Sequence, residues 1–264
     1  MKLAISNIGW VKEQDKEVYQ FMHTYGFEGL EIAPTRIIPD QPYDHLEEAA
    51  AWSRQLLEEE KFVVPSMQSI WFGRNEKIFG SEEERQTLLE YTKKAIDFAQ
   101  VTGCKNLVFG CPRNRVLPDG MNDEDAVAFF RELGEYALAH DTVIGMEANP
   151  PMYNTNYIND TASAIELIHR VDSKGFLLNL DVGTMIANEE SLDVLKGNLH
   201  LVNHVHVSEP GLKPVEKREL HRALFTMLKD YGYQGFVSIE MGKVDNLSVI
   251  EERMKYVKEV FKNE

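Results

Sequence analysis

The sequence predicts one closed (β/α)8 barrel, a single-domain TIM barrel of the α/β class that occupies residues 1–264. Three observations lead to this fold. The length of 264 residues is close to the ~250 residues of a typical barrel. Short β-type runs alternate with stretches of helical periodicity from one end of the chain to the other. The later runs are aliphatic on one face and become small or polar on the other toward their carboxyl ends, as a barrel with a polar mouth requires.

The expected strands are, in chain order, Leu3–Ile8, Gly29–Ala33, Phe62–Gln68, Asn106–Gly110, Val143–Glu147, Leu177–Asp181, Val202–Val207 and Phe236–Met241. Ser81 followed by Glu84 has the pattern of a capping box, and Gly103 stands where a left-handed helix end is expected. A last helix over about Leu247–Phe261 closes the ring. Alternation alone would also allow an open doubly wound sheet. Eight units with inward polar residues on the last four favour closure.

Composition restricts the partners. The formal net charge of −15 argues against a nucleic acid, since a polyanion needs a basic surface, and it also weakens the case for an anionic membrane. Cys104 and Cys111 are the only cysteines, too few for a secreted disulfide scaffold. No run approaches the ~20 apolar residues of a membrane span, and no signal segment is recognisable at the N-terminus. We therefore expect a soluble, cytoplasmic protein with a small-molecule partner.

Four of the expected strands end in a side chain that binds divalent metal ions: Glu147, Asp181, His206 and Glu240. Carboxylate oxygens with one imidazole suit Mn²⁺, Mg²⁺ or Co²⁺ better than a structural zinc site, although Zn²⁺ stays possible. Mn²⁺ is the first choice. Only a fold that gathers strand ends at one rim could bring these four residues to a single ion.

The alternation of side chains along each strand supports such a site. Residues two apart face the same side of a strand, and the residues two before the four candidates are Gly145, Asn179, His204 and Ser238. Any single acid could merely end a strand beside a turn. Matching parity on four successive strands makes coincidence a poor explanation, so we interpret the four residues as a metal site.

The same runs resemble the xylose isomerase-like TIM barrels, a superfamily that includes sugar phosphate isomerases and epimerases. Glu147 opens Glu-Ala-Asn-Pro, Asp181 opens Asp-Val-Gly-Thr, His206 opens His-Val-Ser-Glu and Glu240 opens Glu-Met-Gly. Their order is similar to that of ketose 3-epimerases and of hydroxypyruvate isomerase relatives. The resemblance implies that the four residues hold one divalent ion. It also implies that Glu147 and Glu240 form the catalytic acid/base pair.

The chemistry expected from this resemblance is isomerisation or epimerisation of a small sugar or sugar phosphate. One carboxylate removes the proton next to the carbonyl, the metal stabilises the resulting enediolate, and the second carboxylate returns the proton. Return to the opposite face inverts the carbon atom, whereas return to the adjacent carbon interconverts aldose and ketose. Glu147 and Glu240 would sit across the barrel mouth, as such a pair requires.

The candidate substrate-binding residues are Glu209, Arg113, Asn149, His204, Gln68 and Trp10. Arg113 could hold a phosphate or carboxylate group of the substrate, or it could pair with Asp119 and Asp123. His204 lies one layer below His206 and could orient that ring or simply fill the barrel core. For Glu209, Asn149 and Trp10 the alternatives are rim or structural roles.

The chain departs from the epimerase pattern at two positions. Thr184 stands where the epimerases usually have a histidine, three residues after the metal aspartate. Glu209 is followed by Pro210-Gly211-Leu212, where the family usually has an arginine that binds substrate, so that contact is missing or comes from Lys213 or Arg218. These departures leave the substrate open. Relatives that act on abasic DNA carry extra histidines on early strands, and Glu31 and Gln68 stand there instead.

Two alternative functions remain compatible with the sequence. A lyase, such as an inosose dehydratase, would use the same metal and proton abstraction with loss of a β-hydroxyl group. A non-catalytic sugar-binding barrel would account for the missing arginine. Exchange of solvent deuterium into a sugar without loss of water would favour the isomerase. Association into dimers or tetramers is expected from the resemblance.

Overall fold

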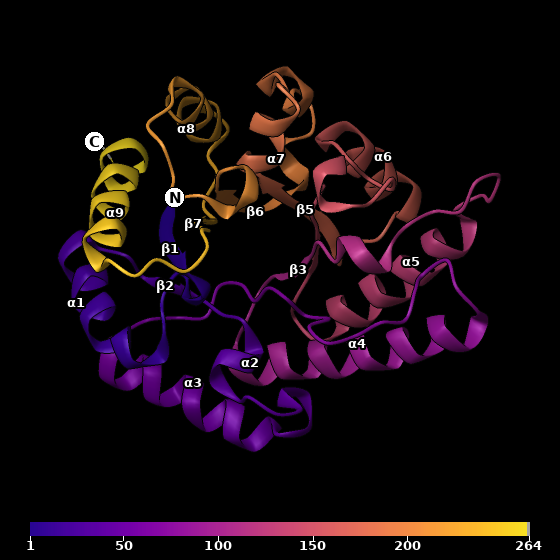
Figure 1. Ribbon diagram of the computed structural model, residues 1–264, viewed down its shortest axis with the longest axis horizontal. Coiled ribbons are helices and arrows are strands. Elements are labelled where there is room, and N and C mark those ends of the chain that lie inside the picture. Colours follow the sequence, from indigo (N-terminus) through magenta and orange to yellow (C-terminus); the bar gives the residue numbers. More distant parts are fainter. Residues whose placement is uncertain (263–264) are drawn as a thin grey trace.

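Parallel strands alternate with helices along residues 1–262, the part of the chain that the computed structural model describes. The strands are β1 (Lys2–Ser6), β2 (Gly29–Glu31), β3 (Leu107–Phe109), β4 (Ile144–Met146), β5 (Phe176–Asp181), β6 (Val202–Val207) and β7 (Phe236–Ile239). The helices are α1 (Asp15–Tyr25), α2 (Pro34–Ile37), α3 (Leu46–Glu60), α4 (Glu82–Thr102), α5 (Glu124–Ala139), α6 (Thr161–Val171), α7 (Val182–Ala187), α8 (Glu219–Tyr231) and α9 (Leu247–Phe261). Helices surround the strands in Figure 1, as the sequence predicts for a barrel.

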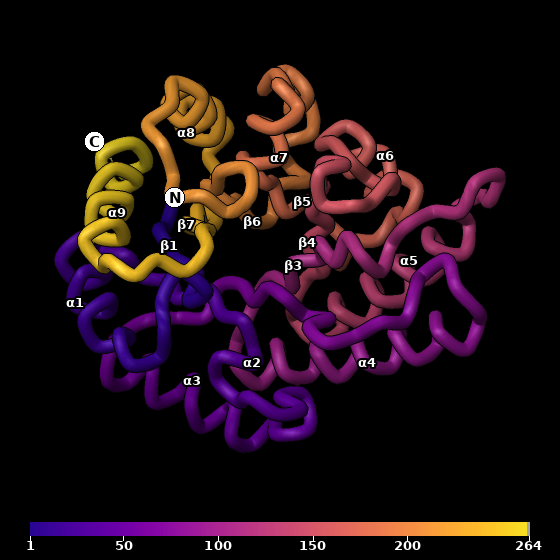
Figure 2. Tube along the Cα trace, viewed as in Figure 1, coloured from indigo at the N-terminus to yellow at the C-terminus, as the bar shows by residue number. Residues whose placement is uncertain are grey.

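The strands form one curled parallel sheet in the order β2-β1-β7-β6-β5-β4-β3. Between its two edges runs the segment 62–68, which follows α3 in the chain. Figure 2 shows the same ring as a trace along the backbone. Val63 pairs with Gly29, and Met67 pairs with both Ile32 and Leu107. These isolated bridges close the ring, so the predicted barrel is confirmed.

The prediction of a regular strand at Phe62–Gln68 is wrong. Within residues 1–262 the sheet has seven strands, and this segment contributes only single bridges. Pro65 lies at its centre and has no N–H to donate to a neighbouring strand. The segment still occupies the third position of the ring, because the N–H of Gln68 donates to the carbonyl of Ile32 at 2.9 Å.

Local signals fix several helix ends. The N–H of Glu84 donates to Ser81 Oγ at 3.2 Å, and the N–H of Ser81 donates to Glu84 Oε2 at 2.9 Å, so the predicted capping box at α4 is confirmed. The helix ends at Gly103, whose φ of 73° is the left-handed conformation that glycine adopts without strain. Among the described residues, no helix combines the length and the apolar character needed to cross a membrane.

The two faces of the sheet differ in chemistry. Outside it, the ring of Phe130 on α5 lies 4.9 Å from that of Phe109 on β3 and 4.9 Å from that of Phe176 on β5, centroid to centroid. Inside the ring the buried side chains are largely polar: Asn106, for example, donates to Asn179 Oδ1 at 3.2 Å. Buried polar groups cost stability unless they are paired, and most of these are. The barrel interior is therefore a hydrogen-bonded network rather than an aliphatic core.

Candidate metal and catalytic site

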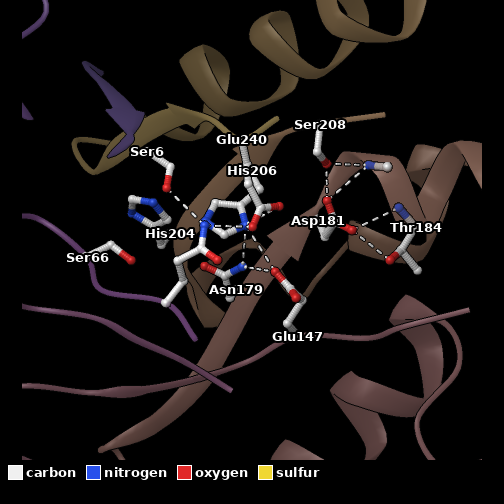
Figure 3. A network of polar contacts seen from close by, with 12 residues as sticks. Ser6, Ser66, Glu147, Asn179, Asp181, Thr184, His204, His206, Ser208 and Glu240 are labelled. Carbon is white, nitrogen blue, oxygen red and sulfur yellow. Dashed lines mark hydrogen bonds and ion pairs between the residues drawn. The ribbon is translucent and has the colours of Figure 1, made fainter. Parts of the chain in front are cut away.

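Three of the four predicted metal ligands converge inside the carboxyl end of the barrel. His206, near the end of β6, places Nδ1 at 3.0 Å from Glu147 Oε1 and 3.3 Å from Glu240 Oε2. The two glutamates directly follow β4 and β7, and all three side chains are buried. Each can present a ligand atom within 4.8 Å of the others. Figure 3 shows both carboxylates beside the imidazole ring.

The fourth residue, Asp181, lies next to this group but faces another way (Figure 3). Its Oδ1 accepts hydrogen bonds from the N–H of Gly183 at 3.1 Å and from the hydroxyl of Ser208. Its Oδ2 accepts from the N–H and the hydroxyl of Thr184 at 3.0 Å and 2.8 Å. Asp181 is thus the N-cap of α7, where free N–H groups compete for its oxygens. Thr184, which replaces the usual histidine, is one of its partners.

Glu31, at the end of β2, is a functional candidate that the sequence analysis missed. Its Oε2 accepts a hydrogen bond from His206 Nε2 at 2.8 Å. His204 Nε2 lies 3.0 Å from the same oxygen, at an angle that does not make a hydrogen bond. Glu31 is 0% exposed and His204 is 2% exposed. Its position in the sequence could have identified it, because Glu31 ends a predicted strand just as the predicted metal ligands do.

Three of the carboxyl groups and His206 all have raised pKa values, for different reasons. Burial raises the pKa of Glu147 and of Glu240, and the pKa of Asp181 is raised by burial and by the charge of Glu147. Burial alone would lower the pKa of His206, but the charges of Glu31 and Glu240 outweigh it and hold that pKa well above its ordinary value. The cluster therefore attracts positive charge: without a metal ion, His206 carries it.

A cavity of about 210 Å³ opens directly above Glu147 and Glu240. Its wall includes Gln68, which donates to Glu240 Oε1 at 3.0 Å, and Asn149, which donates to Glu147 Oε2 at 3.2 Å. Gly110 also lines the cavity. A side chain at this position would crowd the Glu147 carboxylate, because a Cβ atom there would lie 2.8 Å from its Oε2. A larger hollow of about 600 Å³ lies between the segments 39–44 and 72–74 and contains none of these carboxylates. The smaller cavity is the one that meets the candidate chemistry.

Two arginines that follow β3 occupy different places. Arg113 lines the cavity and is exposed, and no ion pair of its side chain occurs within residues 1–262. Asp123, one of its expected partners, pairs instead with Arg170 at 2.7 Å. Arg115, which the sequence analysis did not select, is fully buried and donates to the backbone carbonyl of Glu147 at 3.0 Å and to Asn149 Oδ1 at 2.7 Å. Burial lowers the pKa of Arg115 to about 10.

Three other predicted substrate contacts lie away from the cavity wall. Trp10 is buried in the core and donates from Nε1 to Asp15 Oδ1 at 2.7 Å. Glu209 is 3% exposed and accepts from Arg218 Nε at 2.7 Å, so Arg218 binds this glutamate. His204 lies beneath His206. Substrate binding by Trp10 and Glu209 stays a prediction; each side chain is buried and has a polar partner beside it.

Comparison with known proteins agrees with this architecture. Residues 19–260 match the model of the xylose isomerase-like TIM barrel family. The fold is similar to 3-keto-D-glucoside 4-epimerase from E. coli, with a TM-score of 0.75 and 20% identity over 98% of this chain and 99% of that one. D-psicose 3-epimerase from Clostridium cellulolyticum, solved with D-tagatose, gives a TM-score of 0.72 and 16% identity over 100% and 92% of the chains. A probable 3-DHS dehydratase from Bacillus anthracis gives 0.69 and 16% over 100% and 99%. No curated protein sequence matches the chain.

Proposed function

Because the chain belongs to the xylose isomerase-like TIM barrel family, we propose that it is a divalent-metal-dependent isomerase or epimerase of a small sugar or sugar phosphate. The observation that carries the proposal is the pair of buried carboxylates, Glu147 and Glu240, which meet at Nδ1 of His206 and line a small cavity. Structural neighbours whose names state sugar epimerase activity support it.

The residues at the cavity floor fit a divalent cation. Glu147, His206 and Glu240 supply two carboxylates and one imidazole, and Asp181 could join them if it gave up part of its helix cap. Such oxygen-rich sets suit Mn²⁺, Mg²⁺ or Co²⁺. Burial raises the pKa of both glutamates even beside His206, so a bound cation would favour their charged forms. A divalent ion bound here would act as a Lewis acid toward a substrate carbonyl and its neighbouring hydroxyl group.

Glu147 and Glu240 are proposed to move the proton. The pKa of each glutamate is raised above that of an ordinary glutamate and so lies closer to neutral pH. A carboxyl group with such a pKa can both accept and return a proton. Their neighbours hold them in place. Gln68 donates to Glu240, and Asn149, itself held by Arg115, donates to Glu147. One carboxylate would remove the proton next to the carbonyl and the other would return it.

Arg113 is proposed to bind an anionic group of the substrate. It is exposed at the edge of the same cavity, and a guanidinium group binds phosphate and carboxylate groups well. Substituting Arg113 with Gln would then raise KM for a phosphorylated or acidic sugar by about tenfold, the effect of losing ~1.4 kcal/mol of binding. KM for a neutral ketose would stay unchanged.

The proposed reaction predicts exchange of a substrate proton with solvent. The metal-free protein is loaded with Mn²⁺ and incubated in deuterated water with ketoses, ketose phosphates and keto acids, and deuterium is located by NMR. We expect incorporation next to the carbonyl in one class of compound, loss of incorporation with EDTA, and recovery with Mn²⁺. A dehydrated product would favour the lyase instead. Binding of a sugar without exchange at any carbon would favour a non-catalytic barrel.

A further inference from the structure

We infer that Glu31 is a positioning residue for the proposed metal centre: it fixes the ring of His206 so that Nδ1 faces Glu147 and Glu240. The inference rests on the proposed function. Glu31 lies on β2, across the barrel from β6, and does not reach the cavity. Its hydrogen bond to the site is the one to the His206 ring.

The contacts around His206 assign opposite roles to its two nitrogens. Nε2 lies 2.8 Å from Glu31 Oε2, an oxygen that can only accept when the carboxylate is ionised. Nδ1 lies 3.0 Å from Glu147 Oε1 and 3.3 Å from Glu240 Oε2, so in the metal-free fold both ring nitrogens face carboxylates. A cation bound by Glu147 and Glu240 would take the place of the proton on Nδ1, while Nε2 would keep its N–H to Glu31. The lone pair on Nδ1 would then bind that cation.

Burial makes this arrangement rigid. Glu31 and His206 are both 0% exposed, and water does not compete for their hydrogen bond. A carboxylate that accepts the second N–H of a metal-bound histidine fixes both its tautomer and its orientation, and loss of such a partner typically weakens metal binding ~10- to 100-fold. A rival explanation is that Glu31, His204 and His206 hold an ion of their own, since Glu31 Oε1 and His204 Nε2 have no hydrogen-bond partner in the described structure.

Metal titration of the full chain separates the two explanations. Isothermal titration calorimetry with Mn²⁺ should give one ion per wild-type chain and about 10- to 100-fold weaker binding to Glu31→Ala, with the same stoichiometry. Glu31→Gln keeps an oxygen that accepts from Nε2–H and should recover most of the affinity. Tyr233→Phe removes part-buried hydrogen bonds to the carbonyls of Asn203 and Phe236, outside the site, and is the matched control. Its Mn²⁺ affinity should equal that of the wild type.

The tautomer of His206 provides a readout that a merely structural role would not change. In protein loaded with diamagnetic Mg²⁺, the ring ¹⁵N shifts should show the Nε2–H form in the wild type and in Glu31→Gln. In Glu31→Ala we expect a smaller fraction of the ring in the metal-bound Nε2–H form at the same Mg²⁺ concentration, because the ring is free to turn away from Glu147 and Glu240. If Glu31→Ala does not fold, Glu31→Leu, which restores apolar volume without an acceptor, takes its place in both measurements.

The outcomes distinguish the inference from the proposed function. Unchanged affinity and tautomer in Glu31→Ala would overturn the positioning role alone. Two ions per wild-type chain, with one lost in both Glu31→Ala and His204→Phe, would overturn it in favour of a second metal site. A wild-type protein that binds no divalent ion would overturn both proposals. Normal metal binding without proton exchange in any sugar would overturn only the proposed reaction.

Discussion

His206 and His221 are both 0% exposed, yet their pKa values shift in opposite directions. His206 stands inside the barrel, where the charges of Glu31 and Glu240 overcome burial and raise its pKa. His221 stands on α8, outside the sheet, where its Nδ1 lies 2.9 Å from the hydroxyl of Tyr256 and burial lowers its pKa to about 4. Burial alone therefore does not set the charge of an imidazole. The carboxylates around it do.

The same contrast extends to the two sides of the sheet. The inner side gathers acids whose charge is unfavourable in the metal-free fold, as the raised pKa values of Glu147 and Glu240 show. The outer side packs aromatic rings such as Phe109, Phe130 and Phe176. Functional sites commonly cost stability that is recovered elsewhere. We therefore expect inner substitutions to change activity and outer substitutions to change stability.

The largest expected effect is that of Glu240→Gln. Loss of one member of the acid/base pair should lower turnover roughly 100- to 10,000-fold. The amide cannot ionise, so removal of a buried carboxylate should leave the free energy of unfolding of the metal-free protein unchanged or higher. Urea unfolding in EDTA and turnover with Mn²⁺ measure the two quantities. Substantial remaining turnover would exclude Glu240 as an essential base, and a marked loss of stability would contradict the contrast between the faces.

The second-largest expected effect is that of Phe130→Ala on the outer side of the sheet. Phe130 is 0% exposed between α5 and the sheet, and such truncations cost about 3–5 kcal/mol of unfolding free energy. The Mn²⁺ affinity of the folded protein should not change, because the Phe130 ring packs against Phe109 and Phe176 on the outer side of the sheet. Phe130→Leu, which keeps most of the volume, should cost less. A metal affinity that fell in step with stability would show that the two layers are coupled.

The sequence predicted those features that depend on periodicity. Parity along the strands placed Glu147, His206 and Glu240 on the inner face, and the structure brings them together. The irregular segment at the third position of the ring, residues 62–68, was wrongly predicted as a strand because the prediction used the hydrophobic pattern and not the hydrogen-bonding groups. Pro65 removes a donor without changing that pattern.

Side-chain partners were harder to predict because they depend on distances across the ring. Asp181 ends its strand with the right parity, but nearby N–H groups of α7 and the hydroxyl of Ser208 occupy its oxygens. Glu31 is separated from His206 by 175 positions, so no local pattern links them. Glu209 and Arg218 are only nine positions apart. Their pairing was not predicted because the residues between them form a loop without a regular period.

The smallest expected effect tests the comparison of the two histidines directly. Because the pKa of His221 is about 4 in the folded protein and 6.5 in an unperturbed chain, only the unfolded chain takes up a proton between these pH values. Stability is therefore lost as pH falls from 6.5 to 4 and is unaffected above 6.5. The loss amounts to about 3 kcal/mol.

His221→Gln removes this titration while every other group still titrates. The difference in urea unfolding free energy between the wild type and the variant should therefore shift by that amount between pH 7 and pH 4, in favour of the variant. Equal acid sensitivity of the two proteins would mean that His221 is protonated in the fold. In that case the nearby Glu209 would compensate its charge, and the outer histidine would resemble the inner one.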